Sequence, residues 1–101
     1  FKEDCPDLRN SRVIDVIKEF ADLGMEVDVF DPWADPQQAK DAYGIELTHS
    51  PQGDTYDAIV LTVAHTEFKS LGTAIRAWGK AKHVLFDTKG VLPGDTADGR
   101  L

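Results

Sequence analysis

Cysteine, positive charge and long apolar runs are scarce in this sequence, and each shortage excludes a class of protein. The 101 residues contain one cysteine, Cys5, which cannot form an internal disulfide, and no paired-cysteine zinc spacing. The 11 Lys and Arg residues are outnumbered by 18 Asp and Glu, and the net charge of -7 argues against a nucleic-acid binder. No apolar run approaches the roughly 20 residues that cross a bilayer, and no segment has the pattern of a secretory leader. We therefore expect a cytoplasmic protein with no membrane or nucleic-acid partner.

The length and the apolar content fit one domain with one core. Hydrophobic residues make up 42% of the 101 residues, which is ordinary for a folded protein. We expect this domain to span residues 1–93 and to be followed by a loose tail over residues 94–101, which has little to bury. The sequence opens on Phe1 rather than Met, and we expect it to be a piece of a longer protein.

Hydrophobic periodicity predicts helices that alternate with strands. Apolar residues recur at helical spacing over residues 12–23, with Asn10 or Ser11 available as N-cap and Gly24 as the stop. The other expected elements are strands over residues 25–30, 45–47, 58–64 and 83–87, and helices over residues 35–43, 65–71 and 73–80. This order predicts an α/β fold, a three-layer Rossmann-like doubly wound parallel sheet. Its first strand is largely missing, and we expect an apolar strand just upstream of Phe1.

Charged and aromatic residues gather in the loops expected at one edge of this sheet. Ligands of such sheets bind outside the carboxyl ends of the strands. The loops expected there read FKEDCPDLRN, FDPWADP, VAHTEF and FDTKGVLP. Lys2 and Arg9 precede a helix N-terminus, where cations and backbone amides together suit a phosphate. No GxGxxG follows a strand, so the sequence does not predict an independent dinucleotide site.

Four motifs, FKEDCPDLRNSRVIDVI, FDPWAD, AHTEF and FDTKGVLP, resemble in order and spacing the C-terminal UDP-binding domain of the UDP-glucose/GDP-mannose dehydrogenase family. The first motif is most similar to members that oxidise UDP-N-acetyl-hexosamines to uronic acids for surface polysaccharide. The resemblance implies an NAD-dependent UDP-sugar 6-dehydrogenase, with NAD held mainly by an N-terminal domain and a central helical segment that forms a homodimer. The nucleophilic cysteine of such enzymes lies elsewhere, so this chain is expected to bind UDP-sugar without holding a catalytic residue.

The same resemblance assigns four binding residues. It places Phe1, Lys2 and Lys89 against the UDP-sugar and Arg9 toward NAD. The resemblance also implies that glucose-oxidising relatives commonly carry arginine at the position of Lys89. Lysine keeps the positive charge of that arginine but lacks its planar, two-pronged guanidinium group. We expect Lys2 and Lys89 to converge on one pyrophosphate.

Structural alternatives remain open for several of these residues. Arg9 could pair with an acid of its own loop, and Lys89 could form a strand-end pair with Asp87. Asp31 is expected to form a turn, and Thr66 to cap a helix. His49 and His83 share no spacing with other ligands, so we expect no metal site.

The alternative to an enzyme part is a free-standing, receiver-like α/β binding or regulatory module. A receiver needs a phosphoacceptor Asp at the end of a central strand. The buried run here ends Val63-Ala64-His65, which counts against this alternative.

Overall fold

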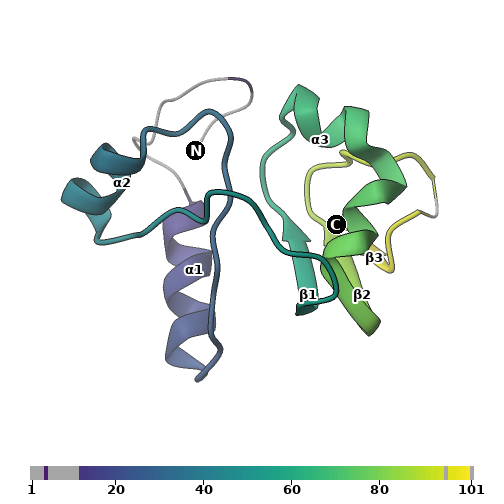
Figure 1. The fold of residues 1–101 in the computed structure, drawn as a ribbon, viewed down its shortest axis with the longest axis horizontal. Coiled ribbons are helices and arrows are strands. Elements are labelled where there is room, and N and C mark those ends of the chain that lie inside the picture. The colour runs from purple at the N-terminus through teal and green to yellow at the C-terminus, as the bar shows by residue number, and fades with distance from the viewer. Residues whose placement is uncertain (1–3, 5–11, 95, 101) are drawn as a thin grey trace. The chain divides into compact units, whose positions relative to one another are not determined.

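The structure, a computed structural model, describes Asp4, residues 12–94 and residues 96–100. The chain divides into two compact units, Phe1–Ser50 and Pro51–Leu101. The first unit holds helices α1 and α2, and the second holds three strands and two helical segments (Figure 1). In the part of the chain that the structure describes, no helix has both the length and the apolarity needed to cross a bilayer.

Helix α1, Val13–Asp22, confirms the helix expected at the start of the chain. Ile14 is buried, and the rest of the apolar side is more exposed. Gly24 ends the helix as predicted, because its φ of 87° is accessible to glycine and its N–H donates to Ala21 O at 3.0 Å. The expected N-caps lie outside the described residues, and Arg12 occupies the cap position without a capping side chain.

Helix α2, Pro36–Tyr43, has local signals at both ends. The Asp35 carboxylate accepts a hydrogen bond from Gln37 N at 2.9 Å, and Pro36 occupies the first turn, where its missing N–H costs nothing. Gly44 closes the helix with φ 68° and donates its N–H to Lys40 O at 2.9 Å. These caps explain why a short, polar segment was predictable as a helix.

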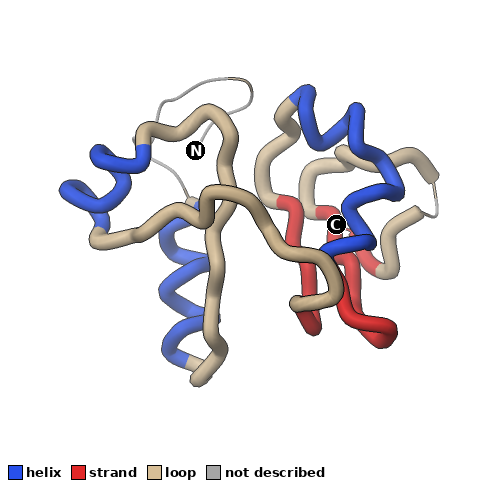
Figure 2. Tube along the Cα trace, viewed as in Figure 1, coloured by secondary structure: helices blue, strands red, loops and turns tan. Residues whose placement is uncertain are grey.

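The strands expected over residues 25–30 and 45–47 need correction. Among the described residues of the first unit, strand pairing is limited to one parallel bridge between Val29 and Leu47, supported by Thr48 N donating to Val29 O at 2.7 Å. Figure 2 accordingly shows this stretch as loop. A β-strand is stable only when it forms hydrogen bonds with a neighbouring strand, and alternation of apolar and polar residues does not provide that neighbour.

The second unit is built on a three-stranded parallel sheet in the order β1-β2-β3, with β1 at Tyr56–Leu61, β2 at Gly79–Asp87 and β3 at Gly99–Arg100. Ile59 pairs with Leu85 in β1 and β2, and both side chains are buried. The prediction of an α/β fold with a parallel sheet is therefore confirmed. Strands β1 and β2 both begin earlier than expected, and β1 also ends earlier.

Helix α3, Thr66–Leu71, and the 3-10 helix η1, Gly72–Trp78, connect β1 to β2. The sequence predicted a helix over residues 73–80, and the structure has a 3-10 helix there that ends at Trp78, because β2 begins at Gly79. Gly72, with φ 53°, separates the two helical segments as expected. Ile75 of η1 is fully buried, and η1 packs against both β1 and β2. Leu71, the last residue of α3, is 41% exposed.

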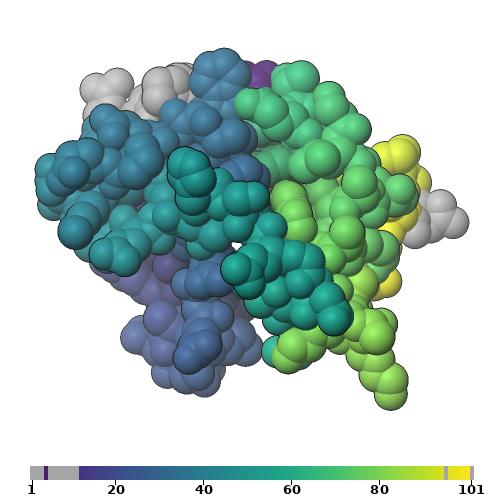
Figure 3. All heavy atoms as spheres, viewed as in Figure 1, coloured from purple at the N-terminus to yellow at the C-terminus, as the bar shows by residue number. Residues whose placement is uncertain are grey.

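The expectation of a loose tail from residue 94 also needs correction. Residues 96–100, which we name the C-terminal segment, end in β3, and Gly99 and Arg100 pair in parallel with Phe86 and Asp87 of β2. In Figure 3 the yellow atoms near the C-terminal end of the chain lie beside the green atoms of the second unit. The segment has little apolar surface, and its order comes from hydrogen bonds and ion pairs that composition does not reveal.

Candidate functional site

The candidate site lies at the carboxyl ends of β1 and β2. These strands are parallel neighbours, so the loops that follow them leave the same edge of the sheet. Thr88 joins the two strand ends, because both its N–H and its hydroxyl donate to Leu61 O, at 3.0 and 2.8 Å. The loop after β2, residues 88–93, carries Lys89, and we name it the Lys89 loop.

A buried carboxylate organises the Lys89 loop. Asp87, the last residue of β2, is 0% exposed. Its Oδ1 accepts from Lys89 N at 3.2 Å and Val91 N at 3.0 Å, and its Oδ2 accepts from Leu92 N at 2.8 Å. Gly90 allows the turn with φ 67°. The loop is thus wound around the side chain of the residue that precedes it.

The surroundings of Asp87 favour its ionised form. Burial by itself would raise the pKa of this carboxyl, but the N–H donors of Leu92, Val91 and Lys89, together with the charge of Arg100, outweigh burial and lower the pKa. A buried carboxylate is tolerated when hydrogen-bond donors surround it. Asp87 is therefore a structural acceptor for the loop.

Lys89 presents an exposed side chain from this loop. Its backbone N–H, rather than its ammonium group, is what Asp87 contacts. The alternative that we considered from sequence was an ion pair between Lys89 and Asp87. In the structure, Asp87 instead accepts hydrogen bonds from backbone N–H groups of the loop. Lys89 follows the carboxyl end of β2, at the edge of the sheet where ligands of parallel α/β folds bind.

The loop after β1 leads into His65, which is 0% exposed and precedes α3. His65, and not Thr66, occupies the N-cap position, and no side chain caps this helix. The carbonyl of His65 accepts from Phe68 N at 3.0 Å, and the two rings lie 5.5 Å apart. The sequence expectation of Thr66 as cap is wrong by one residue.

In the first unit, the interpretation of Asp31 as a turn former is confirmed. Its Oδ1 accepts from Trp33 N at 2.8 Å and from Ala34 N at 3.0 Å. These bonds fix the FDPWAD motif as a carboxylate-centred turn, much as Asp87 fixes the Lys89 loop.

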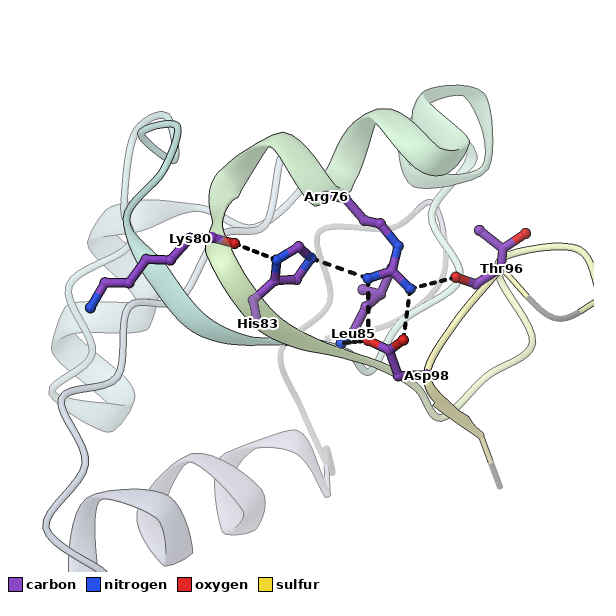
Figure 4. Close-up of polar contacts among 6 residues, drawn as sticks. All are labelled: Arg76, Lys80, His83, Leu85, Thr96 and Asp98. Carbon is purple, nitrogen blue, oxygen red and sulfur yellow. Dashed lines mark hydrogen bonds and ion pairs between the residues drawn. The ribbon is translucent and has the colours of Figure 1, made fainter.

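A second polar cluster, which the sequence did not reveal, ties the C-terminal segment to the rest of the unit (Figure 4). The Arg76 guanidinium of η1 donates to both carboxylate oxygens of Asp98, at 3.0 and 3.2 Å, and to Thr96 O at 2.7 Å. It also lies 3.1 Å from His83 Nε2, whose Nδ1 lies 2.6 Å from Lys80 O. Arg76 thereby joins three parts of the chain.

Asp98 lies between Arg76 and the backbone of β2. The hydrogen bond from Arg76 lowers the pKa of Asp98 most, followed by the hydrogen bond that Oδ2 accepts from Leu85 N at 2.8 Å. The separation of 22 residues between Arg76 and Asp98 explains why no local pattern predicted the pair.

Three of the four binding residues assigned from sequence, Phe1, Lys2 and Arg9, lie outside the described residues. Their roles, and the convergence of Lys2 with Lys89, stay predictions. The structure describes only Lys89 of that set, at the carboxyl end of β2.

A parallel α/β unit with its charged loops at the carboxyl ends of the strands defines a Rossmann-like domain. The sequence narrows this class further, since residues 1–94 match the model of the "UDP-glucose/GDP-mannose dehydrogenase family, UDP binding domain". The chain belongs to this family, as the motifs indicated.

Curated relatives support the same assignment. The chain is 50% identical over 102 residues to the UDP-N-acetyl-D-glucosamine 6-dehydrogenase of Pseudomonas aeruginosa and 48% identical to that of Salmonella typhi, and each match covers 100% of this chain. It is 34% identical to Protein CapL of Staphylococcus aureus over 94% of the chain. The chain spans 24% of the length of the first two relatives and 22% of the third.

Proposed function

We propose that this chain is the UDP-sugar-binding domain of an NAD-dependent UDP-sugar 6-dehydrogenase that acts on a UDP-N-acetyl-hexosamine. The observation that carries the proposal is the identity of about half of the chain to two UDP-N-acetyl-D-glucosamine 6-dehydrogenases, 50% and 48%. The structure supports it with an exposed cation on an ordered loop at the ligand-binding edge of a parallel sheet.

Lys89 is the residue to which we assign contact with the ligand. A diphosphate carries about two negative charges, and an ammonium group is a compact partner for them. The five bonds made by Asp87 and Thr88 hold the backbone on both sides of Lys89. Phe1 and Lys2 complete the substrate contacts in this proposal.

The proposal assigns the chemistry to a longer protein. NAD would be held mainly by another domain, with Arg9 reaching toward it, and that domain would supply the hydride acceptor. The oxidised UDP-sugar would serve surface polysaccharide synthesis, and the full-length enzyme would be a homodimer. A cytoplasmic setting fits a chain with one cysteine, which needs no oxidising compartment.

The receiver-like alternative loses support at Asp87. This residue ends a strand, which is where a phosphoacceptor would stand, but it is 0% exposed and both oxygens accept backbone N–H groups. A phosphoryl donor needs a free, accessible carboxylate oxygen. Asp87 is therefore unsuited to that role.

A ligand panel tests the proposed function. We would titrate the 101-residue chain calorimetrically with UDP, UDP-N-acetylglucosamine, GDP and NAD. We expect heat from the two uridine ligands, weaker or no binding of GDP, and no NAD reduction by the chain. Equal binding of GDP and UDP, or binding of neither, would count against the proposal.

A further inference from the structure

We infer that the C-terminal segment positions the Lys89 loop for its ligand, with Arg100 as the positioning residue and the Arg76–Asp98 pair as its anchor. The inference rests on the proposed function, in which Lys89 contacts the UDP-sugar. Neither the family assignment nor the relatives' names assign a role to these three residues.

Arg100 reaches across the Lys89 loop from β3. Its Cα is paired with Asp87, the carboxylate around which the loop is wound. Its Nη1 donates to Gly94 O just beyond the loop, and its Nη2 lies 3.5 Å from the position a Cβ on Gly90 would take. One side chain thus lies beside the middle of the loop and binds the residue that follows it.

The close approach of β3 depends on Gly99. A Cβ at this position would lie 2.5 Å from Cδ2 of Phe86, which is shorter than side-chain carbons tolerate. With glycine there, the Phe86 ring covers the backbone of β3, and Gly99 pairs with Phe86 in register. Arg100 is held at its position by this packing as well as by its own contacts.

The Arg76–Asp98 pair anchors the segment at its other end. Asp98 N donates to Leu85 O at 2.8 Å, and Asp98 Oδ2 accepts from Leu85 N at 2.8 Å, so Asp98 continues the β2–β3 pairing with its side chain. Arg76 then holds the carboxylate from η1 and also binds Thr96 O. Two parts of the unit therefore fix residues 96–98.

Ordering of the loop before ligand arrives has a consequence for affinity. A loop that must be ordered during binding reduces the affinity, because its lost conformational entropy opposes the contacts it makes. Asp87 holds the loop from inside the sheet, and Arg100 holds it from β3. Removal of Arg100 should therefore weaken the contact made by Lys89 without removing any group that touches the ligand.

Arg100→Gln and Arg100→Lys test this role, with Lys82→Gln as the control because Lys82 is an exposed cation within β2. We expect Arg100→Gln to weaken UDP binding about fivefold, within the range of coupling between distinct groups, and Arg100→Lys to restore part of it. Lys82→Gln should leave the affinity unchanged. Amide hydrogen exchange at Val91 and Leu92, measured without UDP, should quicken in Arg100→Gln and stay unchanged in Lys82→Gln.

A double-mutant cycle separates positioning from direct contact. If Arg100 acts through the loop, Arg100→Gln should add little to the loss already caused by Lys89→Ala. Additive losses would mean that Arg100 binds phosphate itself and would overturn the inference, as would unchanged affinity in Arg100→Gln. Should the wild-type chain bind no UDP, the proposed function fails, and the exchange rates still decide whether Arg100 orders the loop. Asp98→Asn offers a second variant that should quicken the same amides.

Discussion

The Arg76 guanidinium and the Asp98 carboxylate face each other as a two-point ion pair, with Nη2 3.0 Å from Oδ1 and Nη1 3.2 Å from Oδ2. Both side chains are partly exposed, at 31% and 45%, so the pair alone would add little stability in water. Its importance comes from the groups around it, because the same two side chains also bind Thr96 O and Leu85 N.

Acid should weaken the attachment of the C-terminal segment. The folded-state pKa of Asp98 is lowered from the ordinary 3.8, chiefly by Arg76, and that of Asp87 is lowered as well. A lowered pKa contributes stability that is present above the unfolded value and lost as pH falls through the folded value. We expect urea midpoints to fall from about pH 4 downward, and less steeply in Asp98→Asn. An equal slope in wild type and variant would contradict this account.

His83 should be the neutral tautomer that carries its proton on Nδ1. Arg76 has only donors, so His83 Nε2 must accept at 3.1 Å, and Nδ1 then donates to Lys80 O at 2.6 Å. Ring nitrogen chemical shifts near neutral pH should report a protonated Nδ1 and a bare Nε2. The opposite tautomer in those spectra would show that Arg76 does not hold His83 in this way.

Gly99→Ala should detach β3. The new Cβ would meet the Phe86 ring at 2.5 Å, and relief of such overpacking costs about 1–3 kcal/mol. Chemical denaturation of the chain measures this cost. The matched control is Gly99→Ala in a Phe86→Ala background, where the obstructing ring is gone and the added methyl should cost much less. If Gly99→Ala lowers the free energy of unfolding equally in wild type and in Phe86→Ala, contact with the Phe86 ring is not the cause of the destabilisation.

Asp87→Asn should destabilise the second unit by about 2 kcal/mol. The NH2 group of asparagine is a donor, so it would face backbone N–H donors that now bind a carboxylate oxygen. The donors at risk belong to Lys89, Val91 and Leu92. Asp57→Asn is the control, since the Asp57 side chain is 84% exposed and its ion pair with Lys80 lies at the surface. A variant as stable as wild type would show that the loop does not depend on the carboxylate.

Local signals explain what the sequence predicted well. Helix α2 was predictable because Asp35, Pro36 and Gly44 each act within one turn of the helix end. The Asp31 turn was predictable for the same reason. The strand predicted over residues 25–30 was wrong, because strand formation depends on hydrogen-bonding partners elsewhere in the chain. The alternation of apolar and polar residues is the same whether or not such partners exist.

Within the candidate site, too, features set by local sequence were predictable and features set by distant contacts were not. Lys89 was assigned from a motif, and its place after β2 follows from the strand that precedes it. The role of Asp87 depends on a loop that turns back as far as Leu92, and that of Arg76 depends on a residue 22 positions away. No periodicity or composition reports such contacts. The order of the C-terminal segment was missed because it rests on these contacts and not on apolar burial.

The central claim is that Lys89 binds the UDP moiety, and calorimetric titration of UDP into wild type, Lys89→Ala and Lys82→Ala tests it most directly. Lys89 is exposed, and its backbone N–H, which every residue but proline retains, makes the structural contact, so Lys89→Ala should fold normally. We expect about tenfold weaker binding in Lys89→Ala, as for loss of one charge-assisted hydrogen bond, and wild-type affinity in Lys82→Ala. The same affinity in all three chains would contradict the account.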